Sequence, residues 1–514
     1  MPDTQVLICG AGPAGLVLAL WLTRFNVRVR IIDKTAEPGT TSRALGVQAR
    51  TLEFYSQVGL AQTLVERGLE FAVANLWTRG KSAARAAFGE MGKGLSPFPY
   101  MLIFPQDEHE RVLIERLTAE GITVERQTEL LGFEDDGTRV RARLKGPDGT
   151  EDVCKAEYLA GCDGARSTVR DALGVGFPGG TYAHLFYVAD VQGSGPVING
   201  ELHVALDDND FLAAFPMKGP GRARLIGTVQ APEGQHEALA WQDVSKRLLE
   251  RLRINVERVN WFSTYHVHHR VAGRFRQGRA FLLGDAGHIH SPVGAQGMNT
   301  GISDAVNLAW KLAAVVQGRA SPPLLDTYEP ERIAFARRLV ATTDRAFTAV
   351  TSPSRLARLI RVQVVPRLLP VLARSRTFRR FMFRTVSQTA VHYRSSSLSE
   401  GRAGRLRGGD RPPWVTVDEP SEGMTDNFAP LTSLDWQVHV YGEPTPELVE
   451  ACRKRGLALH TFPWRSTMRR SGLRQDAVYL IRPDGYIGLA DTDASPAKLE
   501  NYLDTRGIQP LQAG

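Results

Sequence analysis

Gly10-Ala11-Gly12-Pro13-Ala14-Gly15 decides the fold of this chain, because it joins an apolar strand to a helix through a glycine turn. The strand is Val6-Leu7-Ile8-Cys9, and apolar residues at helical spacing run from Leu16 to Phe25. In this G-x-G-x-x-G pattern the first glycine permits a tight turn and the second lets a pyrophosphate approach the backbone. The third lets the helix and the strand pack closely. The helix N-terminus adds partial positive charge, so the stretch predicts a dinucleotide-binding turn.

An aspartate lies at the distance from the glycine turn at which a dinucleotide-binding fold places a carboxylate for the ribose. Val27 to Ile32 forms a second strand, and Asp33 ends it about twenty residues after the turn, where it can accept hydrogen bonds from ribose hydroxyls. Gly174-Val175-Gly176-Phe177-Pro178-Gly179 matches the same pattern, but it follows a helix and contains a proline, so we do not expect it to bind a nucleotide. One fingerprint does not separate FAD from NAD.

Two distant stretches make that distinction. Residues 161–170 read Gly-Cys-Asp-Gly-Ala-Arg-Ser-Thr-Val-Arg, and residues 284–292 read Gly-Asp-Ala-Gly-His-Ile-His-Ser-Pro. Residues 4–345 strongly resemble the class A flavoprotein monooxygenases of the p-hydroxybenzoate hydroxylase fold. The glycine turn and these two stretches occur in the same order in that class. The chain is most similar to the phenol, aromatic-polyketide and 3-(3-hydroxyphenyl)propionate hydroxylases of that class.

The resemblance implies an α/β fold with three parts. These are a Rossmann-like FAD-binding domain, an inserted antiparallel-sheet substrate domain and a C-terminal thioredoxin-like α/β domain. We expect the FAD-binding domain in residues 1–180 and 271–345, the substrate sheet in 181–270, a helical connection with a linker in 346–412, and the tail domain in 413–514. Gly401 to Pro413, rich in glycine, resembles the linker. No cysteine follows the first strand of the tail, so we expect no dithiol chemistry there.

The resemblance also implies roles for single residues toward FAD. Asp33 would hold the adenosine ribose, Asp163 would help position the pyrophosphate, and Asp285 and Gln106 would face the ribityl chain. The helix that opens near Met298 would direct its N-terminal dipole at the negatively charged edge of a reduced flavin. The full predicted cofactor set is Gly10, Gly12, Pro13, Ala14, Gly15, Asp33, Lys34, Arg43, Gln106, Asp163, Gly284, Asp285, Pro292, Gly297, Met298 and Asn299.

Arg43 and Pro292 are the predicted catalytic residues. Pro292 and the loop from Gly294 to Asn299 would line the reacting side of the flavin. The resemblance implies that the flavin swings out to meet NADH or NADPH near Arg43, for which a surface ion pair is the alternative interpretation. In the substrate sheet, His203, Phe215, Met217 and Tyr265 are the candidate substrate contacts, although alternation alone does not say which face is inward.

Composition narrows the possible partners. The net charge of +8 comes largely from arginines between Arg337 and Arg384, which could attract an anionic partner, but a solvated helix face explains them as well. We therefore expect neither nucleic acid nor a membrane as partner. The four cysteines form no C-x-x-C pair, and the histidines at 266 and 268 have no further ligand at metal spacing, so we expect no metal site. A cytoplasmic monomer or homodimer fits these features.

The predicted function is an FAD-dependent monooxygenase that hydroxylates a phenolic or polycyclic aromatic substrate. NAD(P)H would be the transient electron donor, O2 the co-substrate and a flavin C4a-hydroperoxide the oxidant. Three alternatives remain at this point. They are Baeyer–Villiger or epoxidising chemistry on the same fold, an FAD-dependent reductase, and a flavin-binding protein without turnover.

Overall fold

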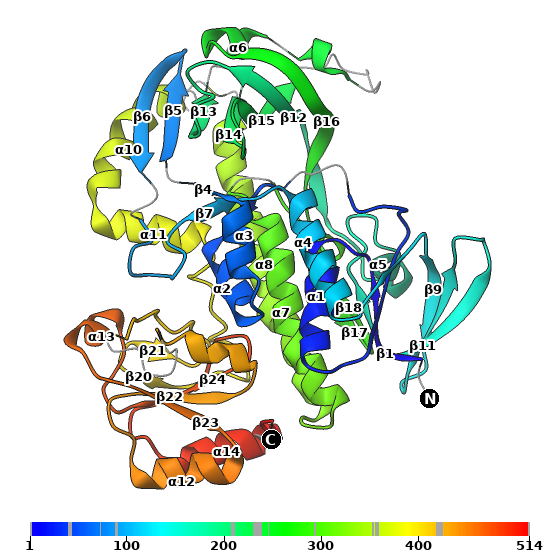
Figure 1. Ribbon diagram of the computed structural model, residues 1–514, viewed down its shortest axis with the longest axis vertical. Helices are drawn as coiled ribbons and strands as arrows, with labels where there is room; N and C mark the ends of the chain where they lie inside the picture. The colour runs from blue at the N-terminus through cyan, green and yellow to red at the C-terminus, as the bar shows by residue number, and fades with distance from the viewer. Residues whose placement is uncertain are drawn as a thin grey trace.

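The computed structural model describes residues 3–39, 44–71, 73–87, 91–206, 211–229, 239–244, 246–291, 294–351, 354, 359–417 and 425–511. Three large sheets organise these residues (Figure 1). The helices that join and cover them run along the centre of the molecule and around its edge. Among the described helices, none is both long enough and apolar enough to cross a bilayer.

The first sheet carries the glycine turn. Its central strand β1 pairs in parallel with β2 on one side and with β11 on the other. Val6, Leu7 and Ile8 of β1 are fully buried, as expected for a parallel strand whose two faces are both covered. The strands in sheet order are β17 (Arg276–Gln277), β18 (Ala280–Leu282), β11 (Glu151–Gly161), β1 (Thr4–Cys9), β2 (Val29–Asp33) and β8 (Val124–Arg126); β10 (Val140–Lys145) also pairs with β11, and β9 (Glu129–Asp135) pairs with β10.

Two long helices cover one region of this sheet and pack against each other. They are α1 (Pro13–Arg24), which follows the glycine turn, and α7 (Gly297–Val316). Both are buried along most of their length: α1 through apolar residues, and α7 through apolar residues together with polar ones such as Asp304 and Lys311. The other helices of this part are α2 (Ala49–Gln57), α3 (Ala61–Arg67), α4 (Gln106–Ala119), α5 (Thr168–Leu173) and α8 (Tyr328–Thr351). A small three-stranded sheet lies between this part and the second large sheet: β3 (Gly46–Val47), β7 (Met101–Ile103) and β4 (Leu69–Phe71).

The second large sheet contains the strands expected between residues 181 and 270, and these pair antiparallel with one another. It also takes in β5 and β6, a hairpin from far upstream whose first strand pairs in parallel with β13. The sequence pattern did not indicate this contribution. The order is β19 (His288–Ile289), β16 (Asn255–Val271), β12 (Gly179–Ser194), β15 (Arg222–Val229), β14 (Phe211–Pro216), β13 (Leu202–Leu206), β5 (Val73–Thr78) and β6 (Lys81–Ala87).

The C-terminal domain is an α/β unit with the predicted thioredoxin-like arrangement. Its core runs strand, helix, strand, helix, then a β-hairpin and a final helix, with β22 parallel to β23 and antiparallel to β24. The strands in order are β21 (Leu406–Arg407), β20 (Glu400–Ala403), β25 (Ile487–Asp491), β24 (Val478–Ile481), β22 (Gln437–Tyr441) and β23 (Ala458–Phe462). The helices are α12 (Pro446–Arg455), α13 (Ser466–Ser471) and α14 (Pro496–Arg506).

The stretch from Gly401 to Pro413 differs from the predicted linker. Its first part forms β20 and β21, and Gly401 pairs with Ala490 in the sheet. The glycines are there for close packing, because a Cβ on Gly409 would lie 2.4 Å from the backbone carbon of Tyr393. This glycine-rich segment is therefore the edge of the C-terminal sheet, and glycine content alone misled the prediction.

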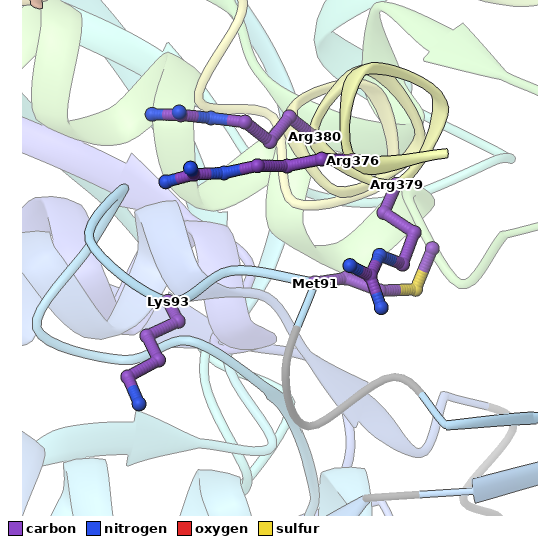
Figure 2. A pocket seen from close by; sticks show the side chains of 5 residues that line it. All are labelled: Met91, Lys93, Arg376, Arg379 and Arg380. Carbon is purple, nitrogen blue, oxygen red and sulfur yellow. The ribbon is translucent and has the colours of Figure 1, made fainter. Parts of the chain in front are cut away.

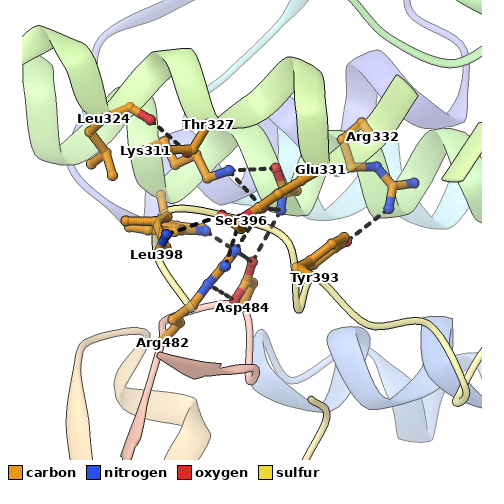
Figure 3. Close-up of polar contacts among 12 residues, drawn as sticks. Lys311, Leu324, Thr327, Glu331, Arg332, Tyr393, Ser396, Leu398, Arg482 and Asp484 are labelled. Carbon is orange, nitrogen blue, oxygen red and sulfur yellow. Dashed lines mark hydrogen bonds and ion pairs between the residues drawn. The ribbon is translucent and has the colours of Figure 1, made fainter. Parts of the chain in front are cut away.

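A buried ionic cluster joins the C-terminal domain to α7 and α8 (Figure 3). Arg482, in the turn between β24 and β25, donates to both carboxylate oxygens of Glu331 on α8 at 2.8 and 3.0 Å. Lys311 of α7 donates to the same carboxylate at 2.8 Å, and Asp484 accepts from Arg482 at 2.6 Å. All four side chains are at most 2% exposed. Charges so deeply buried are tolerated only when they are paired, so each part of the junction depends on the other.

Candidate active site

The glycine turn has the geometry that the sequence predicts. Gly10 has φ +102°, and a Cβ placed there would lie 2.3 Å from the carbonyl oxygen of Cys162. A Cβ on Gly15 would lie 2.0 Å from the carbonyl oxygen of Gly10. Gly12 differs from both, since no described atom lies within 4 Å of its Cβ position. Gly12 precedes α1, and no described side chain caps that helix end. The first and third glycines thus satisfy packing, while the second opens onto space that an anion can enter.

Asp33 closes the turn from the end of β2. Its Oδ2 accepts from the Ala11 amide at 2.7 Å, and its Oδ1 accepts from the Thr35 amide at 2.8 Å. The carboxylate and its neighbour Lys34 line a cavity of about 260 Å³ that also borders Gly10 and Gly12. Asp33 therefore both braces the turn and faces the space beside it.

The second motif forms another wall of this cavity. Asp163 lies directly after β11, where Ser167 donates to its Oδ1 at 2.6 Å and the Val169 amide donates to its Oδ2 at 3.1 Å. Burial raises the pKa of Asp163 above its usual value, although these hydrogen bonds favour the charged form. The motif is joined to the glycine turn because the Cys162 amide donates to the Cys9 carbonyl at 2.7 Å.

The third motif meets the other two at the same end of the sheet. The Leu283 amide donates to the Gly161 carbonyl at 3.0 Å, and the Cβ position of Gly284 lies 3.3 Å from Ala14 on α1. Asp285 is exposed although the residues on either side of it are buried, so its side chain points out of the core at the strand ends. The three stretches that are separate in sequence therefore converge.

Asp304 on α7 holds the third motif in place, a function that the sequence pattern did not suggest. Its Oδ2 accepts from the Gly284 amide at 3.0 Å and lies 2.8 Å from Nε2 of His288. Its Oδ1 accepts from Nε of Arg332 at 2.6 Å. Burial alone would raise the pKa of Asp304, but Arg332 and His288 hold it below its usual value. The signal for this positioning role is a buried carboxylate on α7 that accepts a backbone amide of the third motif, and only the tertiary structure shows it.

The loop before α7 forms the far end of the candidate site. Gly297 and Met298 begin α7, and no described side chain caps its N-terminus. Asn299 is fully engaged with protein groups: it accepts from the Gln48 amide and Thr51, and donates to the carbonyls of Gly46 and Ala295. Its side chain therefore joins residues 46–51 to the loop. Because the side chain is already engaged, Asn299 would contact a cofactor through its backbone.

Two polar atoms beside this loop have no partner among the described residues. They are Oγ of Ser291 and Nε2 of His290, and both are buried. Burial lowers the pKa of His290 to about 4, so its ring is neutral near neutral pH. Unpaired buried polar atoms are costly, and a bound group that hydrogen-bonds to them would remove that cost. Together with the open space at Gly12, they show that the residues present fit a dinucleotide lying from α1 to α7.

Gln106 lies at the start of α4, where its amide donates to the carbonyl of Ala44 at 3.1 Å. Its side chain donates to Glu110 at 2.8 Å, and Glu110 in turn accepts from the Gly39 amide at 3.3 Å. Gln106 thus contacts Ala44, which follows the segment that contains Arg43, and is linked through Glu110 to Gly39, which precedes it. Arg43 itself and Pro292, the two predicted catalytic residues, lie outside the described residues.

The second sheet has two distinct faces. Ala214 of β14 pairs with His203 and Leu225, and these residues share the outer face, which α6 (Arg247–Arg251) and an apolar cluster cover. Phe215 pairs with Arg224 on the opposite, inner face.

The inner face is the side that meets the FAD-binding part. Phe215 packs with Leu45 and Ile103, and Arg224 donates to the Ala44 carbonyl at 3.4 Å. Tyr265 packs with Phe186 in the same layer. The inner face therefore lies against the segments that border the loop before α7.

His203 is separated from the other candidate substrate residues. Its Nδ1 accepts from Trp77 at 2.9 Å and its Nε2 lies 2.8 Å from the side-chain oxygen of Asn199, both on the outer face. The prediction that His203 contacts substrate does not agree with this position, because alternation left the inward face undecided and His203 lies on the outer one. Met217 is buried just beyond the end of β14.

Arg224 and Asp190 form an inner-face ion pair that the sequence analysis missed. Arg224 is 1% exposed and donates to both carboxylate oxygens of Asp190 at 2.6 and 2.8 Å. No short motif surrounds either residue, so nothing in the sequence could have paired them. The pair joins β12 and β15 opposite the Ala44 backbone.

The fold and the dinucleotide site between α1 and α7 define the chain as an FAD-binding protein of the α/β class. The chain belongs to the FAD binding domain family, whose model matches residues 3–343. A relative from Streptomyces rimosus, 6-methylpretetramide 4-monooxygenase, is 37% identical over 98% of this chain and 94% of its own length.

Solved structures give the same result over the whole chain. OxyS anhydrotetracycline hydroxylase from Streptomyces rimosus is 28% identical with a TM-score of 0.79, covering 98% of this chain and 99% of that one. CabE, an aromatic hydroxylase from angucycline biosynthesis, is 27% identical with a TM-score of 0.78, covering 99% and 100%. The resemblance to aromatic flavoprotein monooxygenases, the FAD cofactor and the predicted fold class are thus confirmed.

Proposed function

We propose that this protein is an FAD-dependent monooxygenase that hydroxylates a polycyclic aromatic substrate, with NADH or NADPH as electron donor and O2 as co-substrate. The observation that carries the substrate class is full-length similarity to a monooxygenase of 6-methylpretetramide, combined with an inner sheet face that offers aromatic side chains toward the FAD-binding part. FAD, when bound, supplies the redox centre that accepts electrons from NAD(P)H and activates O2.

The residues of this chain have binding and positioning roles in that reaction. We propose that Gly12 and the α1 N-terminus hold the pyrophosphate, that Asp33 and Asp163 border the adenosine half, and that Asp285 holds the ribityl chain. The N-terminus of α7, near Met298, which no described side chain caps, would favour negative charge on the bound group. Arg43 and Pro292 keep their predicted roles at the exposed and reacting positions.

We place the aromatic substrate between the inner face and the loop before α7. Phe215 and Tyr265 would pack against its rings, and their apolar surface would exclude water from the reacting position. The Arg224–Asp190 pair would keep β12 and β15 in register beside it. His203 is left out of this site.

The experiment measures NADH and NADPH oxidation and O2 consumption by the purified yellow protein with a panel of simple phenols and polycyclic phenols. We expect consumption to rise with polycyclic phenols and one oxygen atom from labelled O2 to appear on an aromatic ring of the product. A lactone product would contradict ring hydroxylation, and turnover of substrate without O2 consumption would contradict a monooxygenase.

We also propose that the protein acts in the cytoplasm, where NAD(P)H is available, and that it is a monomer or a homodimer. Sedimentation velocity of the FAD-loaded protein distinguishes the two assemblies. A larger assembly would contradict this part of the proposal.

A further inference from the structure

One segment of the chain concentrates positive charge to an unusual degree. Residues 345–399 contain eleven arginines and no aspartate or glutamate. This local charge exceeds the net charge of +8 of the entire protein, so the remaining residues together are slightly acidic. A segment with this imbalance attracts an anionic partner.

The same segment exposes large apolar side chains. Of the nine exposed large hydrophobic residues in the described chain, six lie between Leu359 and Phe381. Val371 is 59% exposed and Phe381 is 63% exposed. Scattered single exposures are ordinary, but a concentration on one segment indicates an interaction surface.

These side chains lie on two adjacent helices, α10 (Val365–Arg374) and α11 (Arg376–Val386), at the edge of the molecule (Figure 1). On α10 the exposed residues are Leu368, Val371 and Leu372, whose i, i+3, i+4 spacing forms one stripe. Exposed arginines at 367 and 374 flank that stripe. On α11, Phe383 is buried against Met91 while Phe381 faces away from the protein. One face of α11 thus anchors it and the other is presented outward.

A cationic pocket lies between α11 and the segment that contains Met91 and Lys93. Its volume is about 180 Å³, and its lining comprises Met91, Lys93, Arg376, Arg379 and Arg380 (Figure 2). Four of the five are cations and none is acidic. Arg376 and Arg380 extend in the same direction from α11. Burial and repulsion by Arg376 lower the pKa of Arg380. Like charges held around one cavity repel unless an anion joins them.

We propose that α10 and α11 form a docking surface for an anionic phospholipid bilayer. The pocket of Lys93, Arg376, Arg379 and Arg380 takes a headgroup phosphate, and the α10 stripe with Phe381 enters the boundary between headgroups and acyl chains. Basic residues beside exposed apolar residues on surface helices are the combination that lies in a membrane interface.

The positive charge and the exposed apolar side chains of α10 and α11 together favour an anionic bilayer over other partners. A second copy of the chain would bring the same positive surface to an isologous contact, and a nucleic acid would leave the apolar stripe in water. An anionic layer with an apolar interior answers both features. From the sequence alone a solvated helix face explained the arginines equally well, and the exposed apolar stripe decides between the two interpretations. If the proposed substrate class is correct, docking would bring the enzyme to a layer in which polycyclic aromatic molecules dissolve.

The test is co-sedimentation of the FAD-loaded protein with vesicles of phosphatidylcholine alone or with phosphatidylglycerol added. We expect at least tenfold stronger partitioning to the phosphatidylglycerol vesicles, weakening as salt increases because the attraction is electrostatic. Arg376→Gln/Arg380→Gln is expected to reduce partitioning about tenfold, and Val371→Ser/Phe381→Ser several-fold. The matched control Arg469→Gln/Arg470→Gln removes the same charge from α13 and is expected to leave partitioning unchanged.

FAD absorbance and melting temperature, measured for every variant, separate loss of docking from loss of folding. Equal binding to both vesicle types, no binding at low salt, or equal losses in the α13 control would overturn the proposal. Inorganic phosphate at constant ionic strength provides a further arm. If it abolishes vesicle binding while Val371→Ser/Phe381→Ser has no effect, the pocket holds a free phosphate and α10 and α11 are not a membrane surface.

Discussion

At the scale of single residues, the three glycines of the first turn have different physical roles although the motif writes them alike. Gly10 and Gly15 are required by the protein itself, because their Cβ positions overlap backbone oxygens. No described atom lies within 4 Å of the Cβ position of Gly12, so its lack of a side chain leaves room for a ligand. Because of this difference, substitutions at Gly10 and Gly12 can test FAD binding without a measurement of activity.

Gly12→Ala is expected to fold normally, with a stability change below about 1 kcal/mol, because its backbone conformation suits any residue and its Cβ has room. FAD affinity should fall at least about tenfold, or ~1.4 kcal/mol, because the methyl group occupies the space of the pyrophosphate. Gly10→Ala should instead lose about 2–4 kcal/mol of stability from strain and overlap. Fluorescence titration with FAD and urea unfolding measure the two effects. Equal FAD affinity in Gly12→Ala and the natural protein would contradict the assignment.

His109 on α4 makes a residue-scale prediction about pH. It is fully buried against Tyr55, and burial lowers the pKa of His109 from 6.5 to about 3. Since the folded pKa is depressed, the unfolded chain takes up a proton that the folded chain does not between these two values. The free energy of unfolding therefore falls as pH decreases through this window, by about 1.4 kcal/mol per pH unit for this one group.

His109→Gln should flatten the dependence of the unfolding free energy on pH by about that amount, while other buried histidines keep part of it. Urea unfolding at several pH values between 7 and 5 measures the slope. Tyr55→Phe is the control, because it removes the hydrogen bond but not the burial that lowers the pKa. An unchanged slope in His109→Gln would show that this histidine is not the source.

At the scale of elements, the proposed position of the substrate depends on which face of the second sheet is turned toward the FAD-binding part. Pairing across β13, β14 and β15 puts His203 with Leu225 and Phe215 with Arg224. Only the second pair faces the FAD-binding part. A strand of alternating side chains specifies two faces equally well, and the layers packed on each side decide between them.

The sheet faces predict opposite results for two substitutions. Phe215→Ala should raise the KM for the aromatic substrate about tenfold, corresponding to ~1.4 kcal/mol of lost apolar contact, and lower the yield of product per NAD(P)H oxidised. His203→Gln, on the outer face, should leave both quantities unchanged even if it lowers the melting temperature. Steady-state kinetics with product quantification checks both. A substrate KM that responds to His203→Gln and not to Phe215→Ala would place the substrate on the other face.

At the scale of the whole molecule, the C-terminal domain is joined to the FAD-binding part by buried charge. The turn between β24 and β25 inserts Arg482 and Asp484 against α7 and α8. α7 begins at the candidate active site and also carries Lys311, whose pKa burial lowers to about 8 in spite of Glu331. One helix thus connects the domain junction to the loop that would border the cofactor.

Arg482→Met should lower the free energy of unfolding by about 3–5 kcal/mol, because Glu331 and Asp484 remain buried without their main partner. Arg455→Met removes an arginine from an exposed pair with Asp504 in the same domain and should have little effect. Chemical denaturation of both variants, with FAD release followed in parallel, measures the difference. Comparable losses in the two variants would show that the buried cluster does not hold the domains together.

The sequence by itself determined the cofactor turn, the order of the three motifs and the α/β character of both ends of the chain. It could do so because a glycine turn acts through residues that are adjacent in the chain, and the required φ angle and missing Cβ are properties of those residues alone. Gly10, with φ +102°, and Gly15, whose Cβ position lies 2.0 Å from the Gly10 carbonyl oxygen, show this directly.

Only the tertiary structure decided what depends on partners distant in sequence. In the structure the predicted linker forms β20 and β21, and His203 and Phe215 lie on opposite faces of their sheet. Asp304 accepts a hydrogen bond from the Gly284 amide. The tertiary structure also left the α10 stripe uncovered. Exposure, sheet face and buried pairing are set by whichever layer packs opposite, and that layer comes from elsewhere in the chain.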